Sequence, residues 1–260
     1  MPLRTDNRLR SSNPALRDKI FQNLPATAEP MTLNGTLART GLLLVLMLIT
    51  GAWTWHHFML ATASGGALAG VQAMQPFMWG GVIAGLVFAI ASAFKPNWSP
   101  VTAPLYALAE GTFLGAISAL FELQYHGIVL QAIMASIGVL VVMLFLYRSG
   151  IIKVTQRFRM GVFAATGGIM LFYLATWGLS AFTHVNTSFL FWGGGTWSIL
   201  ISVVVVCVAA LNLVLDFDLV EQATEQGAPK YMEWYCAFAL MVTLVWLYLE
   251  LLRLLANSRR

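Results

Sequence analysis

One stretch decides the fold: residues 199–222 read ILISVVVVCVAALNLVLDFDLVEQ. Its first part, residues 199–211, carries no charge and is apolar enough to belong to a transmembrane helix. Asp216 and Asp218 stand near its end. Carboxylates in such a helix are costly unless they face a protein interior or a water path. We therefore expect the functional chemistry of this chain to lie inside a membrane, around these two aspartates.

The composition places the whole chain in the membrane class. Of its 260 residues, 58% are hydrophobic and only 10% are charged, whereas soluble domains carry about 25% charged residues. The net charge of +4 does not indicate a nucleic-acid partner, because the basic residues lie in the amino tail and in short loops, where membrane topology explains them. Membrane lipid is an expected partner, and nucleic acid is not.

Apolar runs of about 20 residues, the length that a bilayer requires, recur along the chain. They predict an all-α integral membrane protein with seven transmembrane helices, placed roughly at residues 38–60, 76–94, 101–122, 127–147, 160–183, 197–220 and 231–255. The chain then divides into a polar, basic and loosely ordered tail over residues 1–37, a transmembrane domain over residues 38–256, and a short basic tail over residues 257–260.

Basic residues occur in every second loop, which predicts the orientation of the helices. They lie in the amino tail up to Arg39 and in the loop at residues 148–159. Two further loops hold one each, Lys95 and Lys230. Because basic loops favour the cytoplasmic side, the amino terminus is expected in the cytoplasm. Seven spans would place the carboxyl terminus outside, and Arg259 argues mildly against that side.

The two aspartates of the deciding stretch cannot point into one pore from a regular helix. Positions 216 and 218 lie about 200° apart on an α-helix. Asn212 shares a face with Asp216, whereas Asp218 lies on another. Two arrangements remain. Either one aspartate faces the bundle centre and the other a loop arginine, or both lie at the cytoplasmic rim, anchored by Arg157 or Lys153.

Other acids lie within the predicted helices or at their ends. Glu110 is the deepest, and since a lone intramembrane carboxyl group needs a partner or a proton, we expect it to lie against other helices. Glu250 and Arg253 are three apart, so they pair locally, or else Arg253 serves an acid on another helix. Glu122 and Glu233 fall near helix ends, where we expect side chains that are hydrated or that snorkel to the membrane surface.

The third predicted helix also carries Gly111 and Gly115, four residues apart. Small residues let helices approach closely in lipid, so this spacing predicts tight packing. The sequence contains no Ser/His/Asp arrangement, glycine-rich phosphate loop or His-Glu-x-x-His motif, and we expect neither an enzyme nor a cofactor. An intramembrane aspartyl protease would need aspartates on two helices, whereas only Asp216 and Asp218 lie within predicted spans.

Four segments together resemble one family. They are ALAEGTFLGAISALFE at residues 107–122, the basic loop at 147–159, ALNLVLDFDLVEQ at 210–222, and APKYMEWYCAFALMVTLVWLYLELLRLLA at 228–256. The set is similar to the Bax inhibitor/YccA family, also called the transmembrane Bax inhibitor motif family. The longer amino tail, with SSNPAL at residues 11–16, resembles a bacterial branch and implies the bacterial inner membrane.

The resemblance implies a seven-helix bundle whose last helix is surrounded by the other six, and a pH-sensitive leak for calcium or other cations. It also implies an acid on helix six and an acid on helix seven that share a proton. The Phe-Asp-Leu context at residues 217–219 makes Asp218 the first choice and Asp216 the second. For helix seven, a Leu-Tyr-Leu-acid match gives Glu250, whereas matching the helix ends gives Thr243, and the pair would then have lost one acid.

A carboxylate pair has properties that suit a gate. Two carboxylates within hydrogen-bond reach cannot both ionise cheaply, so they hold one proton between them and repel each other when it leaves. Ca²⁺ prefers carboxylate and carbonyl oxygens, which makes Asp218 and Asp216 candidate Ca²⁺ contacts. We expect Asp218 to face the bundle interior and to bond to Glu250.

Two functions of different classes follow. The first is a pH-sensitive calcium or cation leak of the inner membrane, gated by protonation of a carboxylate pair. The alternative is a non-transporting regulator that binds other membrane proteins, such as a membrane protease. A leak needs acids that face a continuous polar path, whereas a regulator needs only a docking surface.

Overall fold

The computed structural model describes residues 29–183 and 195–260, and these are all-α. The helices are α2 (Leu33–Phe94), α3 (Ser99–Gln124), α4 (Ile128–Arg148), α5 (Gln156–Thr183), α7 (Thr196–Glu225) and α8 (Met232–Ser258), with a short 3-10 helix η2 (Pro96–Trp98). Six of them are long and apolar enough to cross a membrane, so the chain is a multi-pass membrane protein. The predicted amino tail covers residues 1–37, of which residues 1–28 lie outside the described residues. α2 begins at Leu33, so the last five residues of the predicted tail are helical.

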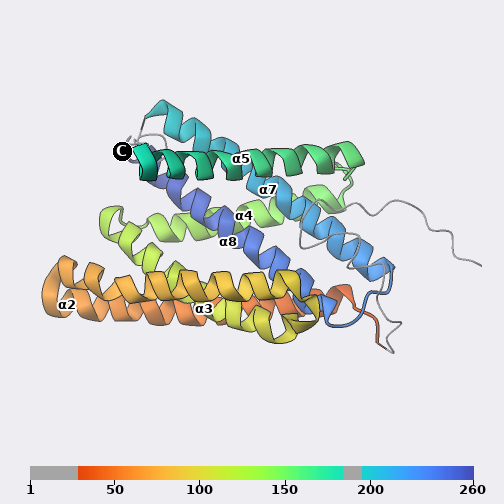
Figure 1. Ribbon diagram of the computed structural model, residues 1–260, viewed down its shortest axis with the longest axis horizontal. Helices are drawn as coiled ribbons and strands as arrows, with labels where there is room; N and C mark the ends of the chain where they lie inside the picture. Colours follow the sequence, from red (N-terminus) through yellow and green to blue (C-terminus); the bar gives the residue numbers. More distant parts are fainter. Residues whose placement is uncertain (1–28, 184–194) are drawn as a thin grey trace, which may run out of the picture.

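α2 is a helical hairpin. Its 62 residues would extend about 93 Å as a straight helix, about twice the thickness of a bilayer. Gly66 interrupts it with a φ of 75°, a left-handed conformation that glycine adopts without strain. The first arm (residues 33–65) and the second arm (67–94) lie side by side (Figure 1), and the rings of Trp53 and Phe77 meet edge to face at 5.4 Å. The predicted loop over residues 61–75 is therefore wrong, because the chain is helical on both sides of Gly66.

α3 packs against the first arm of α2 through two glycines. A Cβ at Gly111 would lie 2.0 Å from the Thr50 hydroxyl, and one at Gly115 would lie 2.4 Å from the carbonyl oxygen of Gly51. Neither position has room for a side chain. The backbone of α3 therefore lies directly against the backbone of α2 at both glycines, as small residues allow in membranes. The tight packing predicted from this glycine pair is confirmed.

α8 is the most buried helix of the described chain. It packs against α2, α3, α4 and α7, and the Tyr173 hydroxyl of α5 also reaches it. Figure 1 shows α8 crossing between the α2–α3 pair and the α5–α7 pair. Tyr235, Met241 and Leu247 are fully buried along its length. α8 therefore contacts each of the other five long helices of the described chain.

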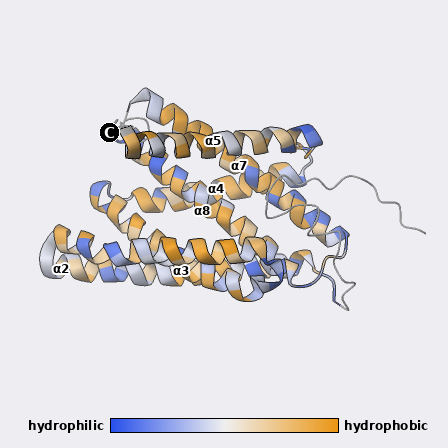
Figure 2. Ribbon diagram, viewed as in Figure 1, coloured by the Kyte–Doolittle hydropathy of each residue, from blue (hydrophilic) through white to orange (hydrophobic). Residues whose placement is uncertain are grey.

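The two ends of the bundle hold different parts of the chain. At one end, which we call the clasp end, residues 29–32 lie on the α7–α8 connection, and the Met31 amide donates to the Ala228 carbonyl at 2.7 Å. At the other, which we call the turn end, the Arg259 guanidinium donates to the His126 carbonyl of the α3–α4 turn at 2.9 Å. Figure 2 shows hydrophilic residues gathered toward the helix ends, with apolar residues along the helices between them.

Candidate functional site at the α5, α7 and α8 helices

Asp216 lies on α7 and faces α8. The Thr243 hydroxyl of α8 donates a hydrogen bond to Asp216 Oδ2 at 2.6 Å, and only 6% of Asp216 is exposed. Asp216 belongs to the buried stripe of α7, since Ala209, Leu213 and Val220 are buried at helical spacing on the same face. A carboxyl group is thus enclosed between two helices, with a hydroxyl as its partner.

Asp218 lies on the other side of α7 and faces α5. Arg159, in the first turn of α5, donates to Asp218 Oδ2 at 2.5 Å, and the Gln222 amide donates to the same oxygen at 2.7 Å. The contacts agree with the first of the two predicted arrangements in that the aspartates point apart, one to α8 and the other to an arginine. That arginine is Arg159; it is neither Arg157 nor Lys153 that anchors the aspartate.

The prediction that Asp218 bonds to Glu250 is wrong. Glu250 lies toward the turn end of α8, where it accepts a hydrogen bond from the Tyr173 hydroxyl at 3.0 Å. Asp216 is the aspartate that reaches α8, and Thr243 is the residue that faces it. The Phe-Asp-Leu context places an acid along the helix but does not fix its direction, and the two positions point about 200° apart.

Glu250 and Arg253 form a buried ion pair on α8. Their side chains meet one helical turn apart, and the residues are 5% and 9% exposed. The ring of Tyr173 lies 5.4 Å from the Arg253 guanidinium, and the Trp246 indole donates to Glu250 at 3.3 Å. Of the two predicted partners for Arg253, the structure adopts the local one. Glu250 is therefore engaged with its own helix and with α5, and not with an acid of α7.

The inner face of α5 carries three polar side chains at intervals of seven residues. Residues seven apart are two helical turns apart and share a face. Arg159, Thr166 and Tyr173 bond to Asp218 at 2.5 Å, to Asn212 at 2.8 Å and to Glu250 at 3.0 Å, respectively. We call these contacts the polar row. It follows α5 for about 21 Å, which is most of the thickness of a hydrocarbon core.

Two of the predicted site residues lie apart from Asp216. Asn212 turns its side-chain amide to Thr166 of α5, so it joins the polar row and does not face α8 with Asp216. Glu110, half-buried on α3, lies against Gly85 in the second arm of α2, where an added Cβ would stand 2.7 Å from its carboxylate. The carboxyl group thus contacts a neighbouring helix, as expected. In the described chain, no hydrogen bond or ion pair joins it to the acids of α7 and α8.

The two aspartates of α7 point to different helices. Asp216 faces α8 and Asp218 faces α5, and the candidate Ca²⁺ contact at each of them stays a prediction. Within residues 29–183 and 195–260, no group of three or more His, Cys, Asp or Glu side chains is placed to hold a metal ion.

Sequence reasoning missed the part played by Glu233, which we expected to be hydrated or to snorkel; that expectation is wrong. It is 2% exposed, and its carboxylate accepts hydrogen bonds from the Thr32 amide and hydroxyl at 3.0 and 3.1 Å, with Arg39 at 3.7 Å. An exposed ion pair adjoins it: the hydrogen bond and charge of Lys230 lower the pKa of Glu29, and Glu29 raises the pKa of Lys230. We call these contacts the clasp. They fasten the start of α2 to the start of α8.

Comparison with known proteins identifies the family. A family model described as Bax inhibitor 1 like matches residues 13–260, which include every contact described above. No curated protein and no solved structure matches the chain. Because the family model covers nearly the whole sequence, the chain belongs to the Bax inhibitor 1 like family.

Proposed function

We propose that this protein is a pH-sensitive cation leak of the bacterial inner membrane, with Ca²⁺ among its permeant ions. Cations cross between α5 and the α7–α8 pair. The observation that carries the proposal is the polar row, because a cation in the hydrocarbon region needs oxygen atoms in place of its water shell. Intramembrane acids that face a protein interior are typical of such paths, and Asp218 and Glu250 lie along this one.

α5 is the element that moves in this proposal. Over residues 156–182, for which burial is described, Val162 and Thr176 alone are buried, so little apolar contact holds α5 in place. Segments with few buried apolar contacts open at the lowest free energy. The hydrogen bonds of the polar row can exchange protein partners for water when α5 shifts, which would open a hydrated path along the row.

The proposed topology has seven spans, with α8 at their centre. Each arm of α2 is long enough to cross a bilayer, so the hairpin contributes two crossings, which with the other five long helices make seven. The alternating basic loops favour a cytoplasmic amino terminus, which would place the clasp end inside and the turn end outside. The contacts of α8 with α2, α3, α4, α5 and α7 support the central position.

The gate in this proposal is a single carboxyl group. When protonated, Asp216 carries no charge and stays buried against Thr243. When ionised, it is a buried anion, and the desolvation of such a charge costs several kcal/mol unless water or a cation reaches it. Entry of water and cations relieves that cost, so we expect flux to rise with pH. The proposal contains no carboxylate pair, because Thr243 stands where a second acid would be needed.

The experiment is calcium flux into proteoliposomes, measured over a series of pH values. Asp216→Asn should flatten the flux–pH curve, because the amide keeps the size and hydrogen bonding of the side chain but cannot titrate. Glu225→Gln, at an exposed acid of the same helix, is the matched control and should leave the curve unchanged. A wild-type curve from Asp216→Asn would show that another group is the gate.

The second candidate is a non-transporting regulator of other membrane proteins, such as a membrane protease. Two observations favour it. Asp216 meets a threonine where the leak reading expected an acid, and the clasp holds the end of the amino tail beside the start of α8, where the tail could dock a partner. Folded wild-type protein that carried no flux at any pH would exclude the leak and favour this candidate.

A further inference from the structure

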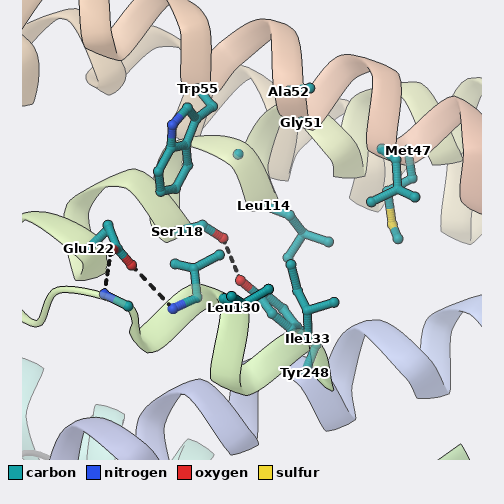
Figure 3. A pocket seen from close by; sticks show the side chains of 14 residues that line it. Met47, Gly51, Ala52, Trp55, Leu114, Ser118, Glu122, Leu130, Ile133 and Tyr248 are labelled. Carbon is teal, nitrogen blue, oxygen red and sulfur yellow. Dashed lines mark hydrogen bonds between the residues drawn. The ribbon is translucent and has the colours of Figure 1, made fainter. Parts of the chain in front are cut away.

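An apolar groove opens on the α2–α4 side of the bundle. It has a volume of about 450 Å³ and is lined by the first arm of α2, by α3, by the start of α4, and by Tyr248 of α8. Leu48 on the α2 wall and Leu130 on the α4 wall are 60% and 67% exposed, so the groove is continuous with the apolar outer surface. Figure 3 shows Trp55 and Glu122 at one end of the groove and Met47 at the other.

The polar groups of the groove are engaged within the protein. Ser118 and Tyr248 share a hydrogen bond of 2.6 Å across its floor. The Glu122 carboxylate accepts hydrogen bonds from the amides of Gly127 and Val129, at the start of α4. Little is left to hold water, which needs several polar partners in a cavity. An apolar gap that opens toward lipid is therefore suited to hydrocarbon.

Two exposed arginines stand beside the turn end of this groove. Gly127 lines the groove, and the neighbouring His126 carbonyl accepts from Arg259 at 2.9 Å. Arg260 donates to the Tyr125 hydroxyl, in the same turn, at 2.8 Å. These contacts hold two positive charges at the end of the bundle where the groove begins. The phosphate of a bilayer lipid is the complementary anion at that level of a membrane.

We propose that this groove binds one phospholipid, with an acyl chain between α2 and α4 and the phosphate on Arg259 and Arg260. The groove runs from Met47 to Trp55, about 12 Å along a helix. That length is close to half of a hydrocarbon core of about 30 Å, the depth that a chain from one leaflet reaches. The bound chain contacts Tyr248 and so touches the buried helix α8. The inference does not depend on the proposed leak.

Lipid binding by the purified full-length protein tests the acyl-chain site. The protein is delipidated in detergent and titrated with a phosphatidylglycerol, and bound lipid is counted by native mass spectrometry. Ala52→Phe places a ring in the groove and should weaken the tightest binding about tenfold, equivalent to excluding about two methylene groups. Ala175→Phe, on the exposed surface of α5, is the matched control and should bind as the wild type does.

The phosphate contact has its own test. Arg259→Gln combined with Arg260→Gln should weaken phosphatidylglycerol binding but not the binding of a diacylglycerol with the same chains, which lacks the phosphate. Lys153→Gln combined with Arg157→Gln removes the same charge at exposed positions elsewhere and should change neither. Equal losses in both double variants would mean general charge attraction and would overturn the phosphate site. Unchanged binding by folded Ala52→Phe would overturn the acyl-chain site.

A second measurement on the wild type decides the matter if Ala52→Phe does not fold. A phosphatidylglycerol with a diazirine in its acyl chain is irradiated with the protein, and the labelled residues are mapped. Labels should concentrate at residues 47–55 and 129–133, the two walls of the groove. Labels spread evenly over the exposed apolar surfaces of α4 and α5 would overturn the proposal.

Discussion

The two sides of this bundle are held together in different ways. On the α2–α3 side, backbones touch at Gly111 and Gly115, where no side chain fits. On the α5–α7 side, the contacts are polar side chains at two-turn intervals, and α5 buries few of its residues. Close-packed backbones admit one arrangement, whereas hydrogen bonds can exchange partners with water and ions. The comparison indicates that α2 and α3 form the scaffold and that α5 is the part able to shift.

The largest effect is expected on the close-packed side. Gly115→Leu places a side chain where a Cβ alone would lie 2.4 Å from the Gly51 carbonyl oxygen, so α3 must move away from α2. We expect the free energy of unfolding to fall by about 3 kcal/mol, measured by denaturation in detergent micelles. Gly138→Leu on α4 is the matched control, because a Cβ there meets nothing within 4 Å. Equal losses in both variants would remove the basis of the comparison.

The next effect is expected where α7 meets α8. Thr243→Val keeps the side-chain shape but removes the donor to Asp216, and a buried polar group without its partner costs about 1–3 kcal/mol. Combining it with Asp216→Leu should restore much of that stability, since an apolar pair needs no hydrogen bond, while the pH dependence of flux is lost together with the carboxyl group. A double variant no more stable than Thr243→Val would show that the hydroxyl does not stabilise the carboxyl group.

A smaller effect is expected at the polar row. Arg159 and Asp218 each keep 16% of their side chains exposed, and Arg159→Gln should lower the unfolding free energy by about 1 kcal/mol or less. Adding Asp218→Asn should cost little more, because the two residues share one interaction. A double-mutant cycle measures this coupling, and strictly additive losses would contradict the pairing.

The smallest effect is expected at the exposed pair of the clasp. Lys230 lowers the pKa of Glu29 from 4.5. The contribution of the ionised Glu29 to the stability of the folded protein is therefore present above pH 4.5 and is lost as pH falls through the lowered pKa. The pKa of Lys230 is raised from 10.5, so its contribution is present below that pH and is lost as pH rises through the raised value. Hydrogen exchange of the Met31 amide should quicken at the acid limit, and Glu29→Gln should abolish that change. At neutral pH, Glu29→Gln should lower Tm less than any of the variants above; a fall as large as that of Gly115→Leu would contradict this ranking.

The direction of Asp216 is contained in the period of its helix. The buried stripe of α7 recurs at spacings of three and four residues, at Ala209, Leu213, Val220 and Ala223, and Asp216 completes it. Asp218 instead continues a polar stripe, with Glu221, Gln222 and Glu225 on the following turns. The family resemblance favoured Asp218 because a short motif fixes position along a helix. The helical period, which fixes direction, is the better guide to burial.

The long apolar helices could be predicted because each run is a local property of the sequence. The hairpin turn could not, since residues 61–75 contain no charge and Gly66 is one of several glycines there. The polar row is hidden for a different reason. Its α5 members stand seven residues apart among apolar neighbours, and their partners lie on two other helices. Which helices adjoin is a tertiary property, and the period of one helix does not contain it.

The clasp has a consequence for the synthesis of this protein. Thr32 and Glu233 are 201 residues apart, so their contact cannot close until the ribosome has made the beginning of α8. Throughout earlier insertion, the start of α2 waits without its acidic partner. Closure of the contact therefore shows that the start of α8 has been made. In a nascent chain that stops before residue 233, Thr32 and the start of α2 lack the contact with Glu233 and stay accessible to quality-control proteases.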